Sequence, residues 1–260
     1  MKLQFYLHFG TKYGQQLWIT GNIEELGNND PAKALLMEYL NEEFWHTTIE
    51  IKRKDFPKNI SYNYILKNED GELLAEWGND RIVELPKKDF QEIQLTDTWN
   101  HAGEYENAFF SAPFDEVLLQ SNHSKNKAGS DKEFTHIFKV KAPLLKKNEA
   151  VCLLGSDAKL SEWLTEEPVL LGRQQNWWTV KLDLSESNFP VAYKYAVYDT
   201  SNKKFIRYED GNNRLLYSAA SKKKLTILHD GFIHLPNDTW KGAGVAIPVF
   251  GLRSKNSFGV

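Results

Sequence analysis

The run YKYAVYDTSNKKFIRYEDGNNR (193–214) contains the strand and the turn that decide the fold of this chain. Its first residues alternate, because Tyr193 and Tyr195 share one face of a strand with the valine at 197, while Lys194 points the other way. A polar turn leads to YEDGNNR (208–214), which places an aromatic ring, a carboxylate, a glycine bend and amides within seven residues. This spacing predicts a strand, a turn and one shallow binding surface.

A tryptophan upstream of this run supplies a second ring. Trp163 follows a serine and a glutamate in an expected loop, where a large apolar ring has little structural reason to lie. Pyranose C–H faces pack on aromatic planes, and sugar hydroxyls pair with amides and ammonium groups. The pattern therefore predicts a site for a flexible sugar chain, made of the rings of Trp163 and Tyr208, the Lys194 ammonium and an amide of the turn. We expect Trp177 and Trp178, in contrast, to be core residues, with at least one facing inward.

The two halves of the chain are copies of one module. Tyr62 and Tyr193 are 131 residues apart, and Arg81 and Arg214 are 133 apart; Gly21 matches 155, Leu26 matches 160 and Trp45 matches 178 in the same way. TDTW (96–99) also matches NDTW (237–240), which suggests that each copy ends alike.

Alternating apolar residues and polar turns predict an all-β protein. Strands are expected at 2–9 and 16–20, which pair early in the sheet, and at 45–51, 60–66, 81–85, 90–95, 134–141, 149–154, 177–184, 190–198, 214–217 and 224–229. Their number and spacing favour two immunoglobulin-like antiparallel β-sandwich domains in tandem. The segment 31–44 has a helix-like composition, but its counterpart contains Pro168 and Gly172, so we expect it to be irregular with one helical turn.

The domain boundaries follow from the repeat and from local composition. SNHSKNKAGSDKE (121–133) is polar and aperiodic, so it is expected to be a linker between a first module over 1–120 and a second over 134–240. A chain of 260 residues is long enough for two such cores. The last segment, 241–260, contains an apolar run followed by basic residues.

The motifs of the second module resemble those of a known family. GSDAKLSEW (155–163), then Trp178, the YKY at 193–195 and YEDGNNR (208–214) resemble the starch-binding family 20 carbohydrate-binding modules. The resemblance implies that Trp163, Lys194, Tyr208 and Asn213 form the principal glucan site. Tyr208 departs from the tryptophan that is usual in this family, and its smaller ring should still stack.

The first module departs from the same pattern. Asn29, Asn63, Ala75 and Asp80 stand where the ring, the lysine, the second ring and the amide are expected, so its principal site should be lost. Trp77 could stack in a shifted geometry, although a packing role is the simpler interpretation.

The family also has a second glucan site, built from two tyrosines. The resemblance implies that Tyr13 and Tyr39 form it in the first module, while Lys147 stands at the position of Tyr13 in the second. Tyrosines at strand ends commonly serve packing alone, so that reading stays open.

Composition limits the partners and the compartment. With 32 basic and 35 acidic residues the net charge is −3, which favours neither nucleic acid nor an anionic membrane and fits a neutral glucan such as starch, glycogen, maltodextrin or a maltooligosaccharide. The lone Cys152, in an apolar run, is expected to be a buried thiol. The start MKLQFYLHFG (1–10) has no signal-peptide cleavage site, and no apolar run approaches a membrane span, so the cytoplasm is the expected compartment.

Motifs for chemistry are missing from the sequence. The seven histidines lack metal-ligand spacing, and no nucleophile elbow, phosphate loop or nucleotide fingerprint occurs, so we expect no catalytic residue, no metal and no cofactor. GAGVAIPVFGLRSKNSFGV (242–260) resembles the opening of the glycoside hydrolase family 77 barrel of the 4-α-glucanotransferases. That resemblance implies a parent transferase that moves α-1,4-glucan segments and whose catalytic carboxylates lie beyond Val260.

Two other functions compete with this reading. Both modules could be structural, docking a barrel or holding an oligomer with vestigial sugar binding, and a glucan pull-down would discriminate. An intrinsic enzyme is disfavoured because the aromatic and amide site lacks a carboxylate pair. The sequence leaves open whether the chain forms oligomers.

Overall fold

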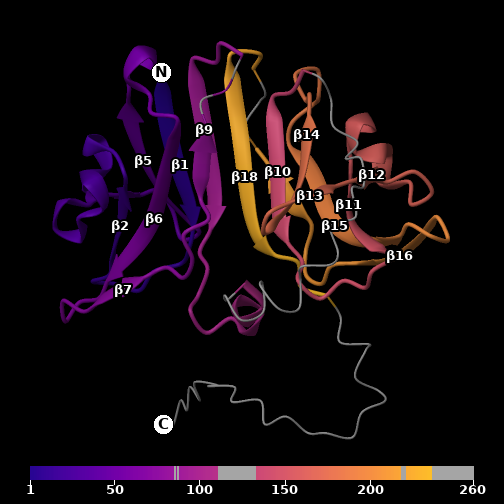
Figure 1. Ribbon diagram of the computed structural model, residues 1–260, viewed down its shortest axis with the longest axis horizontal. Helices are drawn as coiled ribbons and strands as arrows, with labels where there is room; N and C mark the ends of the chain where they lie inside the picture. Colours follow the sequence, from indigo (N-terminus) through magenta and orange to yellow (C-terminus); the bar gives the residue numbers. More distant parts are fainter. Residues whose placement is uncertain (85, 87, 111–132, 218–220, 236–260) are drawn as a thin grey trace, which may run out of the picture.

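The computed structural model describes residues 1–84, 86, 88–110, 133–217 and 221–235. The regular structure of these residues consists of strands and short 3-10 helices, which confirms the predicted all-β class with two sandwiches (Figure 1). The predicted linker, apart from its last residue, and the segment 241–260 lie outside the described residues, so the proposed domain boundaries remain predictions. No helix in the described ranges is long and apolar enough to cross a membrane.

In the described residues, each module contains nine strands. The first contains β1 (Lys2–His8), β2 (Gln16–Gly21), β3 (Leu35–Leu36), β4 (Glu38–Tyr39), β5 (Phe44–Glu50), β6 (Asn59–Lys67), β7 (Leu73–Ala75), β8 (Ile82–Glu84) and β9 (Glu92–Thr98). The second contains β10 (His136–Lys141), β11 (Glu149–Gly155), β12 (Val169–Leu170), β13 (Gly172–Gln174), β14 (Trp177–Leu182), β15 (Val191–Asp199), β16 (Lys204–Tyr208), β17 (Arg214–Leu216) and β18 (Lys224–Phe232). The 3-10 helices are η1 (Glu24–Asn29), η2 (Pro31–Lys33), η3 (Arg53–Asp55), η4 (Tyr105–Phe110) and η5 (Ala158–Trp163).

Most strand predictions agree with these bounds, with informative exceptions. The expected early pairing of β1 and β2 is wrong, because β2 pairs with β3 and β6 while β1 pairs with β5 and β9. The two strands instead face each other across the first core, to which both contribute fully buried apolar side chains. Segment 31–44 does contain one helical turn, η2, but two short strands follow it.

Each module has its own outer sheet. In the first module this sheet contains β2, β3, β6, β7 and β8, and in the second it contains β11, β12, β15, β16 and β17. All pairs within both outer sheets are antiparallel, as predicted. Trp177 and Trp178, predicted as core residues, are both buried in the second module.

The two modules share one sheet. Its eight strands run in the order β13-β14-β10-β18-β9-β1-β5-β4, and Figure 1 shows β9 and β18 side by side at its centre. β18 pairs with β9 in parallel, from Lys224 opposite Glu92 to His229 opposite Asp97, and the Lys224 ammonium lies 3.4 Å from the Glu92 carboxylate. The pairs β1 with β9 and β10 with β18 are also parallel. The sequence repeat did not reveal this junction, because strand patterns do not identify pairing partners.

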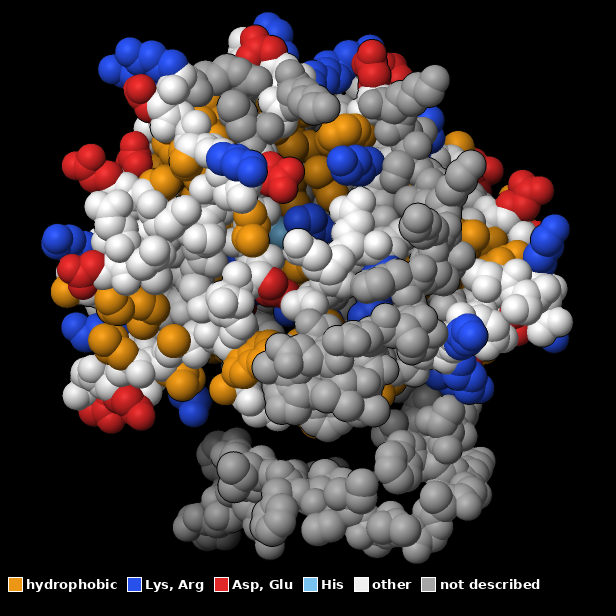
Figure 2. All heavy atoms as spheres, in the orientation of Figure 1, with side chains coloured by type: hydrophobic (Ala, Val, Ile, Leu, Met, Phe, Trp, Pro, Cys, Tyr) orange, Lys and Arg blue, Asp and Glu red, His pale blue; other side chains and the backbone are white. Residues whose placement is uncertain are grey.

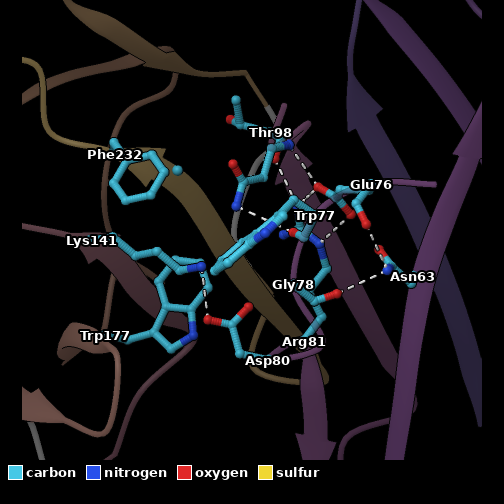
Figure 3. Close-up of a pocket in the computed structure, with 12 residues that line it drawn as sticks. Asn63, Glu76, Trp77, Gly78, Asp80, Arg81, Thr98, Lys141, Trp177 and Phe232 are labelled. Atoms are coloured by element: carbon cyan, nitrogen blue, oxygen red, sulfur yellow. Dashed lines mark hydrogen bonds and ion pairs between the residues drawn. The ribbon is translucent and has the colours of Figure 1, made fainter. Parts of the chain in front are cut away.

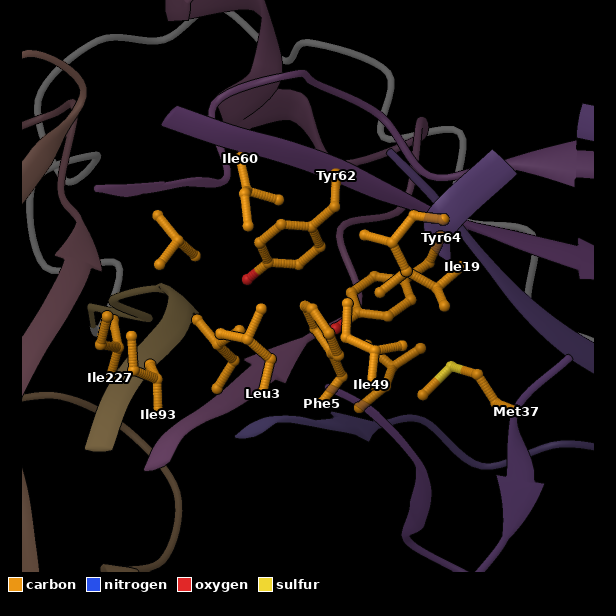
Figure 4. Close-up of a cluster of buried hydrophobic side chains, with 14 of the residues drawn as sticks. Leu3, Phe5, Ile19, Met37, Ile49, Ile60, Tyr62, Tyr64, Ile93 and Ile227 are labelled. Carbon is orange, nitrogen blue, oxygen red and sulfur yellow. The ribbon is translucent and has the colours of Figure 1, made fainter. Parts of the chain in front are cut away.

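β18 is buried on both of its faces. Successive side chains of a strand point to opposite sides of a sheet. Leu225 and Ile227 belong to the first core, whereas Leu228 belongs to the second. Figure 4 shows Ile227 beside Ile93 and Leu3, among the side chains of the first module. The two cores therefore lie on opposite faces of the shared sheet, and the last strand of the second module completes the core of the first.

The carboxylate of Asp97, on β9 at the junction with β18, accepts buried hydrogen bonds. The Asp97 Oδ2 atom accepts from the hydroxyls of Tyr62 at 2.9 Å and Tyr64 at 2.6 Å, and its Oδ1 atom lies 2.6 Å from the His229 Nδ1 atom. Asp97 and His229 are both completely buried. Asp97 occupies in the first module the place of Asp230 in the second, which accepts from Tyr193 and Tyr195. The structural counterpart of TDTW is thus HDGF (229–232), not the predicted NDTW, which lies outside the described residues.

Because β18 contributes side chains to both cores, two adjacent residues of this strand test the shared-core interpretation. Ile227→Ala should destabilise the protein by about 2–5 kcal/mol through a cavity in the first core, although residue 227 belongs to the second repeat. Native-state hydrogen exchange should show the loss of protection first in β1 and β5. Leu228→Ala is the matched control and should weaken protection in β14. Loss confined to β14 in Ile227→Ala would contradict the shared-core interpretation.

The junction also predicts how stability depends on pH. Burial lowers the pKa of His229 to about 4, and burial lowers that of His136 equally. Burial alone would raise the pKa of Asp97, but Arg81 and the interactions with His229 lower it to about 2. Both histidines thus stabilise the fold when neutral. This stabilisation is complete above the unfolded-state pKa of about 6.5 and is lost as the pH falls toward 4. The stabilisation from Asp97 is lost as the pH falls from about 4 toward 2.

We therefore expect the free energy of unfolding to fall continuously from pH 6.5 to pH 2. Between pH 6.5 and 4, His229→Gln should reduce the slope by up to about 1.4 kcal/mol per pH unit, because one proton fewer is taken up on unfolding. Urea unfolding at a series of pH values measures this slope. An unchanged slope in the variant would show that His229 does not titrate with folding.

Candidate functional site

The predicted residues of the second module meet on the outer face of its outer sheet. Cys152, Ala196 and Tyr208 are neighbours across β11, β15 and β16, and Lys194 lies two residues from Ala196 on the same face. The tyrosines at 193 and 195 point into the core instead, as the alternation predicted. Sheet register therefore brings a buried apolar floor, one ammonium and one ring to the same surface.

Trp163 reaches this surface from η5. Its ring lies 6.5 Å from that of Tyr208, centroid to centroid, at an interplanar angle of 66°, and both rings pack partly against the apolar floor. The cysteine in the floor, Cys152, is fully buried as predicted, and burial raises its pKa to about 12. The two rings thus pack on the apolar floor with one side and are half-exposed to solvent on the other.

The backbone that carries Trp163 is strained. Ser161, Glu162 and Trp163 have φ values of 62°, 46° and 65°, in the left-handed region that side-chain-bearing residues seldom adopt. The hydroxyl of Ser161 donates to the carbonyl of Glu167 at 2.6 Å, which ties the loop down. Such conformations cost on the order of 1–3 kcal/mol per residue and concentrate at functional sites.

A glycine lets this loop pack closely on the sheet. A Cβ atom at Gly155 would lie 2.4 Å from the carbonyl oxygen of Ala192 and 2.6 Å from a methyl carbon of Leu160. No other residue type fits there without movement of the backbone. The same close approach occurs at Gly21 in the first module, which explains the repeated glycine.

A partly buried ion pair shapes the turn that carries Tyr208 and Asn213. The Arg214 guanidinium donates to both carboxylate oxygens of Glu209, at 3.0 and 2.9 Å, and the backbone N–H of Tyr195 donates to Glu209 Oε1 at 3.0 Å. Bidentate pairs of this kind fix orientation as well as position. The clamp closes residues 209–214 into a tight bend and leaves Tyr208 half-exposed and Asn213 exposed on either side.

Lys194 lies at the same bend. Its ammonium donates to the carbonyl of Gly211 at 2.6 Å, and Gly211 has a φ of 85°, which suits glycine. An ammonium has three donors, so two others can bond to sugar hydroxyls. The structure thus brings Trp163, Lys194 and Tyr208 to one surface, and the exposed Asn213 lies in the same bend.

On the corresponding surface of the first module, the polar side chains bond to other groups of the protein. Asn63 donates to the carbonyls of Glu76 and Gly78, at 3.1 and 2.9 Å, and so replaces the lysine as a tie to the bend. Asp80, in the place of the amide, pairs with Lys141 at 2.8 Å, across the junction between the modules. The side chains that would meet a sugar are therefore absent or engaged elsewhere.

The two tyrosines expected to form a second site are both exposed. Tyr13 has 98% of its surface exposed, in the turn between β1 and β2, and Tyr39 has 56% exposed on β4. The ring of Tyr39 packs edge-on against Trp45 at 5.5 Å. The backbone N–H of Phe9 bonds to the carbonyl of Glu43, which places the β1–β2 connection beside the β4–β5 turn at the same end of the module.

A cavity between the modules was not predicted from the sequence. Figure 3 shows a pocket at this place, where Trp77 points from the first module toward Lys141 and Trp177 of the second. Only the shifted-ring interpretation of Trp77 gave a signal for it. The sequence of one repeat does not indicate which residues of the other module Trp77 contacts.

Charge does not point to an ionic ligand. Figure 2 shows acidic and basic side chains interspersed over the described part of this face, without a continuous patch of one sign. Among the described residues, no group of three or more histidine, cysteine, aspartate or glutamate side chains is placed to hold a metal ion.

Comparisons with known proteins show what this chain is similar to. The family model described as "Starch binding domain" matches residues 1–94 and 134–227. A 4-alpha-glucanotransferase DPE2 of Oryza sativa subsp. japonica is 26% identical over 274 residues, which cover 99% of this chain and 28% of that protein.

Two solved structures are also similar. A family 15 glucoamylase from Hypocrea jecorina is 22% identical, with a TM-score of 0.35, over 38% of this chain and 17% of its own. The family 20 module of a maltotetraose-forming amylase from Pseudomonas saccharophila is 18% identical, with a TM-score of 0.29, over 36% of this chain and 99% of its own.

The contrast between two tryptophans separates site from scaffold. Trp163→Ala should leave the melting temperature within a few degrees of wild type, because the ring is half-exposed. Trp178→Ala should lower it clearly, through a core cavity costing about 3–5 kcal/mol. Differential scanning calorimetry of both variants makes the comparison. Unfolding of the module by Trp163→Ala would assign that ring to the scaffold.

Proposed function

This chain belongs to the starch binding domain family, and we propose that it binds α-glucan chains on the surface formed by Trp163, Lys194, Tyr208 and Asn213. The observation that carries this proposal is the meeting of two half-open rings, an ammonium and an exposed amide at one bend. The ligands that fit are starch, glycogen, maltodextrins and maltooligosaccharides.

The geometry suits a helical sugar chain better than a flat one. The ring planes of Trp163 and Tyr208 are inclined by 66°, so two successive glucose units that turn relative to each other can each pack on one ring. Lys194 and Asn213 lie near the bend, where hydroxyls of adjacent units need a donor and an acceptor. The clamp of Glu209 and Arg214 holds these groups before the sugar arrives, which limits the entropy lost on binding.

A second and weaker contact is proposed for the first module. Tyr13 and Tyr39 offer exposed rings at one end of it, while the principal surface there lacks its ring and its free lysine. Two weak sites on linked modules increase retention on a polymer through effective concentration, although neither is tight by itself.

The role in a larger protein is also a proposal. The chain spans about a quarter, 28%, of the length of the rice relative that it matches. We propose that these modules deliver α-1,4-glucan to a 4-α-glucanotransferase barrel in the cytoplasm. The nearly complete coverage of this chain by that relative supports the transferase, and the single buried thiol is compatible with a reducing compartment.

Calorimetric titration with maltoheptaose tests the principal site. Trp163→Ala and Tyr208→Ala should each weaken binding about thirtyfold, corresponding to about 2 kcal/mol for the loss of an aromatic anchor. Tyr208→Trp should retain binding. Tyr105→Ala removes an aromatic ring that is 65% exposed outside the site, and it is the matched control.

Two results would change this assignment. Unaltered affinity in a folded Trp163→Ala variant would move the site elsewhere, and no binding by the wild-type chain would favour structural or docking modules. The first-module contact is tested separately in the Trp163→Ala background, where Tyr13→Ala should weaken residual binding and Asn63→Ala should not.

A further inference from the structure

A cavity of about 350 Å³ opens between the two modules, away from the surface described above. The loop between β7 and β8 contributes Trp77, Gly78, Asn79 and Asp80, η4 contributes Phe110, and the turn before β14 contributes Asn176. Neither module encloses this space alone. Its volume is within the range of small-ligand sites in proteins.

A smaller space adjoins this cavity and shares Trp77, Gly78 and Asp80 with it. The smaller space has a volume of about 10 Å³, about that needed by one water molecule, and lies between Trp77, Lys141 and Trp177. Trp177 is 95% buried, and its Nε1–H finds no hydrogen-bond acceptor within the described part of the chain. A buried donor of this kind favours a ligand oxygen or a water molecule at that point.

The charges in this cavity balance. The Lys141 ammonium lies 2.8 Å from the Asp80 carboxylate and over the rings of Trp177 and Phe110, at 4.6 and 5.4 Å. An anion would meet the carboxylate and a cation would meet the ammonium. A neutral ligand with hydroxyl groups meets neither penalty, and the amides of Asn79 and Asn176 offer both donors and acceptors to it.

Two rings complete the match to a sugar. Trp77 and Phe110 are both half-exposed at the cavity, and they come from separate elements, the β7–β8 loop and η4. Sugar C–H faces pack on such rings, as in the principal site. We propose that this cavity is an additional α-glucan subsite, shared between the modules and specific to their arrangement around β9 and β18.

This inference rests on the proposed function, because it takes α-glucan as the ligand. The cavity lies apart from the principal site of the second module. One of its walls is the loop of the first module that has lost its own principal site, and the other wall belongs to the second module. Asp80, which stands in place of the recognition amide, is directed to the junction by Lys141.

Nuclear magnetic resonance can distinguish the two sites. During titration of the full chain with maltoheptaose, the Trp77 indole N–H and the Asn176 side-chain amide should shift, and both should still shift in Trp163→Ala/Tyr208→Ala. Shifts at Trp163 without shifts at Trp77 and Asn176 at saturation would overturn the inference and leave the proposed function standing. Shifts at none of these positions would overturn both.

Substitution at the rim gives a second measurement. In the Trp163→Ala/Tyr208→Ala background, Asn176→Ala and Asn79→Ala should each reduce residual maltoheptaose affinity about five- to tenfold, as expected for a lost hydrogen bond. Tyr217→Ala removes a ring that is 71% exposed in the second module outside the cavity and should have no effect. Unchanged affinity in both asparagine variants, with the fold intact by calorimetry, would overturn the subsite.

Discussion

The parallel pairing of β9 with β18 is the constraint on which the rest of the molecule depends. Six residues of each strand are in register, and the pairing converts two four-stranded sheets into one sheet of eight strands. It places apolar side chains of β18 alternately in two cores, so that a strand of the second module completes the core of the first. Hydrophobic burial is the main favourable term in folding, and here it acts across the repeat boundary.

The same pairing makes the junction polar as well as apolar. Asp97 receives two tyrosine hydroxyls from its own module and His229 from the other, all without exposure to solvent. Breaking one partner of such a buried group costs more than the bond itself contributes, because the remaining charge stays desolvated. The network therefore favours one relative orientation of the modules.

Within each module, a common scaffold can be separated from the recognition groups. Glu209 with Arg214 and Glu76 with Arg81 form equivalent buried pairs, and each bend receives a tie from the strand position of Lys194 or Asn63. The scaffold is thus kept in both copies. The outward-facing ring, ammonium and amide are kept in only one, which explains why the repeat was visible in the sequence although the two surfaces differ chemically.

Much of this arrangement could be predicted from the sequence, and the exceptions have physical causes. Alternation identified the strands that have one buried face, and spacing identified Trp163, Tyr208 and their polar neighbours. Short edge strands such as β7 and β12 contain two or three residues, too few for a periodic signal. The junction and its cavity depend on pairing between distant strands, which a repeat of 131 to 134 residues cannot specify.

The left-handed backbone at residues 161–163 has a consequence for how such modules change over time. The first module has Gly27, Asn28 and Asn29 in the same conformation, and these residue types tolerate positive φ with little strain. The second module keeps serine, glutamate and tryptophan there at a cost in stability. Any copy released from the need to hold a sugar would gain stability by exchanging its ring for asparagine, so drift favours a tandem pair with one working copy and one relaxed copy.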